Sequence, residues 1–136
     1  GKIVEVRDQG VNDFAVSTVF ENSNTDINYD HLSDVTLKVG DSVKAGDTLG
    51  SVAPYGSGTY GRYELMVKDV NQATNAATYL CPMEFLDSSV KESLTNDLKQ
   101  FFTDWNTFMG KTVHDLTAMN PTGCLKSKLT EAEVGL

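Results

Sequence analysis

The segment LKVGDSVKAGDTLG, residues 37–50, repeats a Gly-Asp turn after six residues and constrains the fold more than any other stretch of the chain. Glycine reaches the positive φ angles that a tight turn requires, and the aspartate after it can hydrogen-bond to nearby backbone. Val43 lies between Gly40-Asp41 and Gly46-Asp47, and we expect its side chain to point inward. The pattern predicts two short strand fragments joined by sharp bends, and therefore short antiparallel strands around them.

Alternating apolar and polar residues predict five further strands around this double turn. They cover residues 2–7, 14–20, 25–32, 48–53 and 62–68. In the third of these strands, a period of two is expected to place His31 on the face of Tyr29 and Leu32 on the opposite face. The first half of the chain is thus predicted to be a small antiparallel β unit.

The composition limits the classes of function. The 136 residues suffice for one domain, or one domain with an appendage. A net charge of −8 without a basic cluster argues against nucleic acid as a partner. The Gly-rich loop 54–61 lacks the Gly-Lys-Ser/Thr end of a phosphate loop, and it precedes a predicted strand where a phosphate loop precedes a helix. We therefore do not expect this loop to bind a nucleotide. No apolar run reaches the roughly 18 residues of a membrane span, and the start at Gly1, without a signal peptide, is expected to be a processed or truncated end.

A long amphipathic helix is predicted in the second half of the chain. Residues 71–80, rich in Asn, Ala and Thr, are expected to form a linker. Pro82 can begin a short helical turn, and Ser89 with Glu92 matches a capping box for a helix over 89–109 that ends at Gly110. Its aromatic residues exceed what packing on a small β unit requires, so we expect one edge to pack on that unit and the other to contact a second copy or a partner protein. These residues are Phe101, Phe102, Trp105 and Phe108.

The two cysteines flank this helix. A disulfide between Cys81 and Cys124 would enclose about 43 residues. Such a bridge is typical of a protein outside the cytoplasm, either extracellular or periplasmic, and two free buried thiols are the alternative. His114 has no neighbour at the spacing of a metal ligand, so we interpret it as a surface or packing residue.

Residues 1–70 resemble the second half of an M23 peptidase domain of the lysostaphin or LytM type. The matching segments are YDHLS at 29–33, VGDSVKAGDTLG at 39–50 and, after a Gly-rich loop, RYELMV at 62–67. The opening GKIV is similar to a Gly-x-Val-Val strand of that family. The resemblance implies a small antiparallel β fold of the barrel-sandwich type, which normally holds one zinc ion and cuts peptide cross-links of bacterial cell walls.

The residues at the zinc positions depart from the family pattern. Family members supply a His and an Asp from a segment upstream of Gly1, and a His-x-His at the positions where this chain has Arg62 and Glu64. Arginine does not lose a proton to bind a metal, and Glu64 alone does not provide the three protein ligands of a catalytic zinc. His31 matches a catalytic His of the family and is expected to be catalytic only if the domain is active. We therefore expect no metal and no cofactor, with zinc as the alternative.

The guanidinium of Arg62 could bind a carboxylate through its planar fork, so the groove that the resemblance implies could hold an acidic peptide or a glycan without cutting it. We expect this groove to be lined by Tyr29, His31, Tyr60, Arg62 and Glu64. Biotinyl and lipoyl carriers share the Gly-Asp bend, but their modified lysine lies at a hairpin tip, whereas Lys68 follows Met66-Val67 at the end of a predicted strand. A carrier is therefore the weaker interpretation.

Three segments are expected along the chain: an M23-like β domain over 1–70, a linker over 71–80, and a helical extension with a tail over 81–136. The expected fold class is mainly β with an α-helical extension. The expected function is that of a non-catalytic structural or binding module of a protein outside the cytoplasm. That protein could be a subunit of a larger assembly. The alternative is a zinc-dependent cell-wall endopeptidase whose upstream ligands lie on a removed segment.

Overall fold

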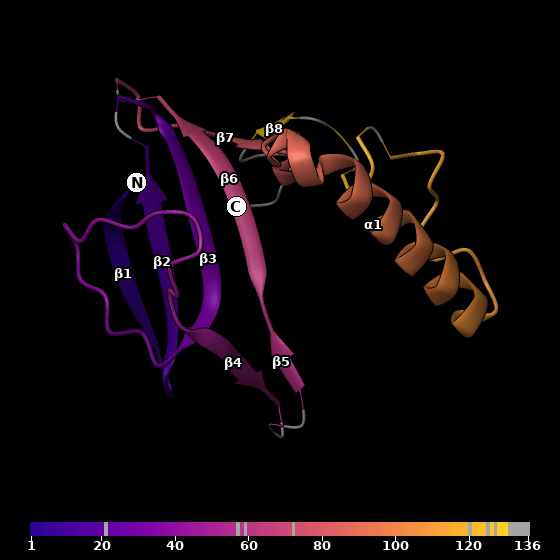
Figure 1. Ribbon diagram of the computed structural model, residues 1–136, viewed down its shortest axis with the longest axis horizontal. Helices are drawn as coiled ribbons and strands as arrows, with labels where there is room; N and C mark the ends of the chain where they lie inside the picture. The colour runs from indigo at the N-terminus through magenta and orange to yellow at the C-terminus, as the bar shows by residue number, and fades with distance from the viewer. Residues whose placement is uncertain are drawn as a thin grey trace. The chain divides into compact units, whose positions relative to one another are not determined.

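The structure, a computed structural model, describes residues 1–20, 22–56, 58, 60–71, 73–119, 121–124, 126 and 128–130. The chain divides into two compact units, Gly1–Thr78 and Tyr79–Leu136. It is mainly β with one long helix, which confirms the predicted fold class (Figure 1). The boundary between the units falls inside the range predicted as a linker, and residues 77–80 of that range form a strand.

Eight strands make up the β structure of the described residues. They are β1 (Lys2–Gly10), β2 (Asp13–Val19), β3 (Thr25–Ser33), β4 (Ser51–Tyr55), β5 (Tyr60–Arg62), β6 (Glu64–Val70), β7 (Ala77–Leu80) and β8 (Lys128–Thr130). The strand order is β1-β2-β3-β6-β7-β8, with β4 pairing with β3 and β5. The pairings of β1 through β6 are antiparallel. Because this order has two ends, the sheet is open and does not close into a barrel.

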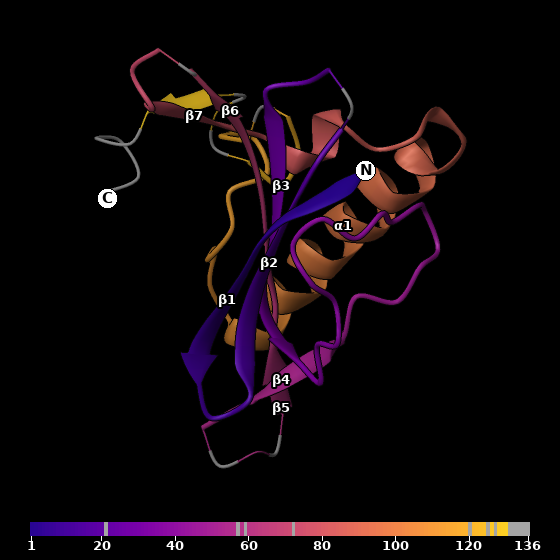
Figure 2. The same cartoon turned by 90° about the vertical axis from the view of Figure 1, so that its left-hand side faces the viewer.

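One face of the sheet carries the apolar core of the first unit. Ile3, Val16 and Leu32 are buried there. The segment 34–50 covers this face and contributes the partly buried Val35, Leu37, Val43 and Leu49. In Figure 2 this segment loops out to one side of β2 and β3. The core of the first unit therefore lies between strands β1, β2 and β3 and this segment.

The double turn forms as predicted, but the strand fragments around it do not. Gly40 and Gly46 have φ angles of 97° and 92°. In each turn the carboxylate accepts a hydrogen bond from the backbone of the lysine three residues earlier, Asp41 from Lys38 at 2.8 Å and Asp47 from Lys44 at 3.0 Å. In segment 37–50, pairing of the strand type is confined to an isolated bridge to β1, because the two turns fix much of this backbone locally.

The second unit contains the short helix η1 (Pro82–Glu84) and the long helix α1 (Ser88–Met109). The N-cap of α1 is Asp87, whose Oδ1 accepts a hydrogen bond from the backbone of Ser89 at 2.8 Å. The predicted capping box at Ser89 is therefore wrong, because the capping aspartate lies two residues earlier. Gly110 ends the helix in the left-handed conformation, as predicted.

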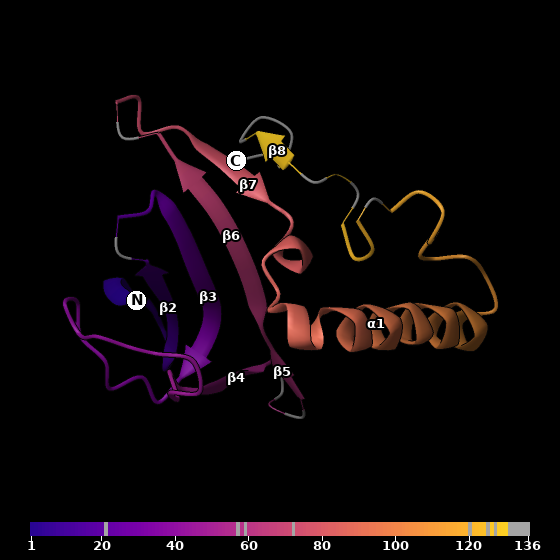
Figure 3. The ribbon, with the colours of Figure 1, turned by 45° about the horizontal axis from the view of Figure 1, so that its top comes forward.

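A disulfide joins Cys81 to Cys124, which confirms the predicted bridge. After Gly110 the chain turns back along α1, as Figure 3 shows. The side chain of Asn106 holds this return segment, since its Oδ1 accepts hydrogen bonds from the backbone of Val113 and His114. His114 stacks on Phe102 with ring centroids 4.5 Å apart, so its interpretation as a packing residue is confirmed.

The aromatic residues of α1 fall into two groups. Phe102 is half-buried and contacts Phe101 and His114. Phe101, Trp105 and Phe108 are exposed, with Phe108 at 78%. None of the residues of α1 is fully buried. Among the described helices, none is both long enough and apolar enough to cross a membrane.

Candidate functional site

A bulge in β3 creates the candidate site. Phe14 pairs with Leu32 and Val16 with Tyr29, so two residues of β3, Asp30 and His31, lie opposite the single residue Ala15 of β2. His31 adopts a φ of 62°, a left-handed conformation that is unusual for a residue other than glycine. The extra residue returns Leu32 to the core face and leaves the side chain of His31 beside that of Asp30. The predicted alternation of this strand is therefore wrong from position 31 onward.

Three side chains form a chain of hydrogen bonds at this bulge. Nδ1 of His31 lies 2.9 Å from Oδ2 of Asp13, which is at the start of β2. On the other side of the ring, Nη2 of Arg62 hydrogen-bonds to Nε2 of His31. A guanidinium can only donate, so Nε2 must accept, and the ring proton must lie on Nδ1, where it is donated to Asp13. The two contacts thus fit an imidazole whose proton lies on Nδ1 and whose Nε2 accepts.

Arg62 is held from several directions. Its Nε lies 3.8 Å from Oε1 of Glu64, and its guanidinium carbon lies 4.9 Å from the centre of the Tyr55 ring. The same Oε1 of Glu64 is 3.8 Å from Nε2 of His31. The His31 side chain is only 12% exposed, whereas those of Arg62 and Glu64 are 44% and 50% exposed. The imidazole is therefore the inner part of the site, and the charged pair faces solvent.

Asp30 supports the bulge from inside. It is buried, and its Oδ1 accepts hydrogen bonds from the backbone of His31 at 2.9 Å and from the side chain of Gln9. A buried carboxylate is tolerated when donors of this kind satisfy it. Asp13 is less well satisfied, because its Oδ1 is buried and has no hydrogen-bond partner among the described residues.

Asp13, Asp30 and His31 each bring one metal-ligand atom to within 4.8 Å of the others. Carboxylates and imidazole are ligands that zinc accepts. Here, however, Asp13 and His31 bind each other, Asp30 is bound by Gln9 and the backbone, and the remaining imidazole nitrogen faces a guanidinium. The residues at this site do not fit the zinc centre that the M23 resemblance implies, so we derive no chemical step through a metal.

Buried polar groups continue along the same face of the sheet. Nδ2 of Asn28 donates to Oγ of Ser17 at 2.9 Å, and Ser17 in turn donates to Glu5 at 3.1 Å. Farther along β3, Asp26 pairs with Lys68 at 3.4 Å. Burial raises the pKa of Asp26, and this effect outweighs the opposite effect of Lys68. The two faces of β3 therefore differ in chemistry, with the core on one and a row of polar groups on the other.

The structure brings together three of the five residues predicted to line a groove. His31, Arg62 and Glu64 form the site. Tyr29 packs against the apolar core instead, and Tyr60 is exposed, with its ring centroid 6.3 Å from that of Tyr55. Sequence analysis missed four participants: Gln9, Asp13, Asp30 and Tyr55. Of these, only Asp30 carried a signal, its place beside His31, and the assumed alternation assigned it to the other face.

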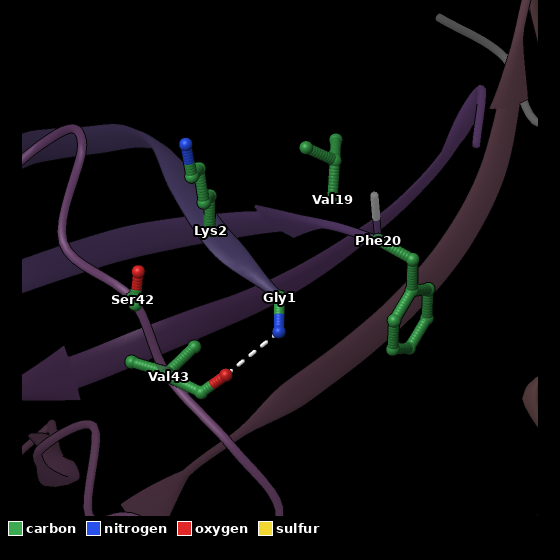
Figure 4. A pocket seen from close by; sticks show the side chains of 6 residues that line it. All are labelled: Gly1, Lys2, Val19, Phe20, Ser42 and Val43. Carbon is green, nitrogen blue, oxygen red and sulfur yellow. Dashed lines mark hydrogen bonds between the residues drawn. The ribbon is translucent and has the colours of Figure 1, made fainter. Parts of the chain in front are cut away.

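A cavity of about 310 Å³ lies elsewhere in the first unit. It is lined by Gly1, Lys2, Val19, Phe20, Ser42 and Val43, and Figure 4 shows Gly1 donating a hydrogen bond to the backbone of Val43. Apart from Lys2 and Ser42, its side chains are apolar or absent. It offers no arrangement of acids, bases or nucleophiles comparable with that at His31.

Comparison with known proteins gave no relative. No protein-family model matches the chain, and searches of curated proteins and of solved structures found no match.

Proposed function

We propose that Gly1–Thr78 is a non-catalytic binding module, similar to a degenerate M23 peptidase domain, in a protein that works outside the cytoplasm. The observation that carries this proposal is the hydrogen bond from Arg62 to Nε2 of His31. It places a permanent cation on the imidazole nitrogen that a metal or a general acid–base mechanism would use. A guanidinium stays protonated in proteins and does not release a proton to chemistry near neutral pH.

The location outside the cytoplasm is supported by the disulfide between Cys81 and Cys124. Disulfides form and persist mainly in oxidising compartments.

We further propose that the exposed aromatic residues of α1 contact a second copy or a partner protein. Sedimentation of the intact protein and of Phe108→Ser, over a range of concentrations, tests this second point, and a monomer at all concentrations in both removes the case for a second copy.

The decisive experiment for the binding module measures metal and cleavage together. The intact protein is exposed to zinc and dialysed, after which its zinc content is measured and cleavage of glycyl peptides and of peptidoglycan stem peptides is followed. We expect substoichiometric zinc and no cleavage. Stoichiometric zinc, together with cleavage that stops on chelation, would establish the alternative, a zinc-dependent endopeptidase.

A pair of variants tests the role given to Arg62. In Arg62→Ala the guanidinium is gone and Nε2 of His31 is released, so zinc uptake should exceed that of the intact protein. Tyr60→Ala is the matched control, because Tyr60 lies on the same strand and is exposed, and no hydrogen bond or ion pair joins it to His31 among the described residues. Equal zinc uptake by both variants and the parent would show that the guanidinium does not exclude the metal.

A further inference from the structure

We propose that the site binds a carboxylate group of its ligand through the outer edge of Arg62, and that Asp13 positions this edge from the far side of His31. The inference rests on the proposed function and names the ligand chemistry for it. Arginine offers five N–H donors in a planar fork that matches a carboxylate.

The described contacts use only one side of that fork. Nη2 gives one hydrogen to His31, and Nε faces Glu64. Nη1 has no hydrogen-bond partner within the described part of the chain. One of its hydrogens and the second hydrogen of Nη2 therefore form an outer pair of donor positions on a side chain that is 44% exposed. Two parallel N–H donors of this kind can bind both oxygens of a carboxylate.

The guanidinium is oriented before any ligand arrives. The ring of Tyr55 lies against its face, and Nε2 of His31 holds its inner edge. Holding an arginine in its bound conformation reduces the conformational entropy lost on binding. His31 can hold Arg62 only while Nε2 lacks a proton, and Asp13 secures that state by accepting the proton of Nδ1 at 2.9 Å. Asp13 therefore acts as a positioning residue through His31.

The surrounding charges favour a singly charged carboxylate over a phosphate. Glu64 lies 3.8 Å from Nε and reduces the positive potential at Arg62. Asp13 and Asp30 are also acidic, but both are engaged on the side of the imidazole away from Arg62. Asp13 bonds to Nδ1 of His31, and Asp30 accepts hydrogen bonds from Gln9 and from the backbone of His31. A ligand with two charges would meet more repulsion from Glu64 for the same pair of donors.

The test compares three small peptides by NMR titration of the intact protein, following the side-chain signals of Arg62 and His31. Acetyl-Ala-Ala carries a terminal carboxylate, acetyl-Glu-amide carries a side-chain carboxylate, and acetyl-Ala-Ala-amide carries neither. We expect the first, the second or both to bind at least about tenfold more tightly than the third. Which of the two binds identifies the source of the carboxylate. Equal affinity of all three peptides, or no binding of any, overturns the inference.

Three variants separate the steps. Arg62→Lys keeps the charge but loses the planar fork, and should weaken carboxylate binding about tenfold. Glu64→Gln removes the competing charge and should strengthen it about threefold. Asp13→Asn also removes a negative charge, yet we expect it to weaken binding, because an amide can donate to Nδ1 and leave the proton on Nε2. The ¹⁵N shifts of the His31 ring report that change directly.

Asp13→Asn thus distinguishes positioning from simple electrostatics. Tighter binding in Asp13→Asn, or an unchanged His31 tautomer, would overturn the role of Asp13. Failure of the proposed function has a different signature, since zinc uptake and peptide cleavage do not depend on which peptide end is recognised. A protein without zinc that binds no carboxylate would retain the non-catalytic module and lose this inference.

Discussion

The two units of the chain are stabilised in different ways. In Gly1–Thr78 the buried residues include Ile3, Val16 and Leu32, and the segment 34–50 covers them. In the described part of Tyr79–Leu136, Cys81 is the single fully buried residue, and it belongs to the disulfide. A small unit without a buried core needs another source of stability, and a covalent link is a common one. The first unit therefore depends on packing and the second on its bridge.

The largest expected effect comes from removing that bridge. The double variant Cys81→Ser, Cys124→Ser should destabilise the second unit by about 4 kcal/mol, because a crosslink between residues 43 apart limits the unfolded chain. The helical circular dichroism signal should be lost at a lower denaturant concentration. The backbone amide NMR signals of the first unit should keep their midpoint. A common shift of both signals would mean that the units unfold together.

The next largest effect lies in the core of the first unit. Ile3→Ala should lower its free energy of unfolding by about 3 kcal/mol, since the side chain is 1% exposed and leaves a cavity. Val4→Ala, on the same strand but 43% exposed, is the control and should cost less than about 1 kcal/mol. Denaturant titrations of both variants check the difference. Equal costs would show that the core is not the main source of stability here.

The third effect concerns the two groups of aromatic residues in α1. Phe102 packs on His114, so Phe102→Ala should destabilise the second unit by about 2 kcal/mol. Phe108 is 78% exposed, and Phe108→Ala should change its stability by less than about 0.5 kcal/mol. Thermal unfolding at low protein concentration measures both. A large loss in Phe108→Ala would mean that this side chain is covered in the native state.

The smallest effect concerns Asp26. Because its pKa is raised in the folded state, its protonated form favours folding below about pH 3.8, and this contribution is lost as the pH rises through the folded pKa. Asp26→Asn should therefore raise the midpoint of thermal unfolding slightly at pH 7. The difference from the parent should vanish on acidification to pH 3. A lower midpoint at pH 7 would show that the pair with Lys68 outweighs the cost of burial.

Local patterns predicted much of the fold. The glycines and aspartates of the double turn and Gly110 at the end of α1 each act through chemistry that neighbouring residues determine. The bridge between Cys81 and Cys124 was predictable for a different reason, because the chain has two cysteines and they flank the predicted helix. The open edge of the sheet was not predictable in this way, because closure depends on pairing between distant strands. The N-cap was misplaced by two residues because Asp87 and Ser89 are both good capping residues.

The candidate site was predicted only in part. Arg62 and Glu64 share a face in the extended chain, so their proximity follows from spacing alone. The approach of Asp13 depends on the bulge at His31, which inserts one residue into β3 without any glycine to mark it. Tyr29 was misassigned for the same reason. It packs against the core, and the bulge moves His31 off the face on which Tyr29 lies.

The repeated turn of segment 37–50 has a consequence for the order of folding. Lys38 and Lys44 each bond to an aspartate three residues away, so both turns can close within microseconds, before distant strands meet. The bonds that fasten the segment to the sheet are long-range, from Ile3 to Asp41 and from Gly40 to Ile3. The amide of Lys44 should thus gain protection from hydrogen exchange early in refolding, and that of Ile3 only when β1 docks.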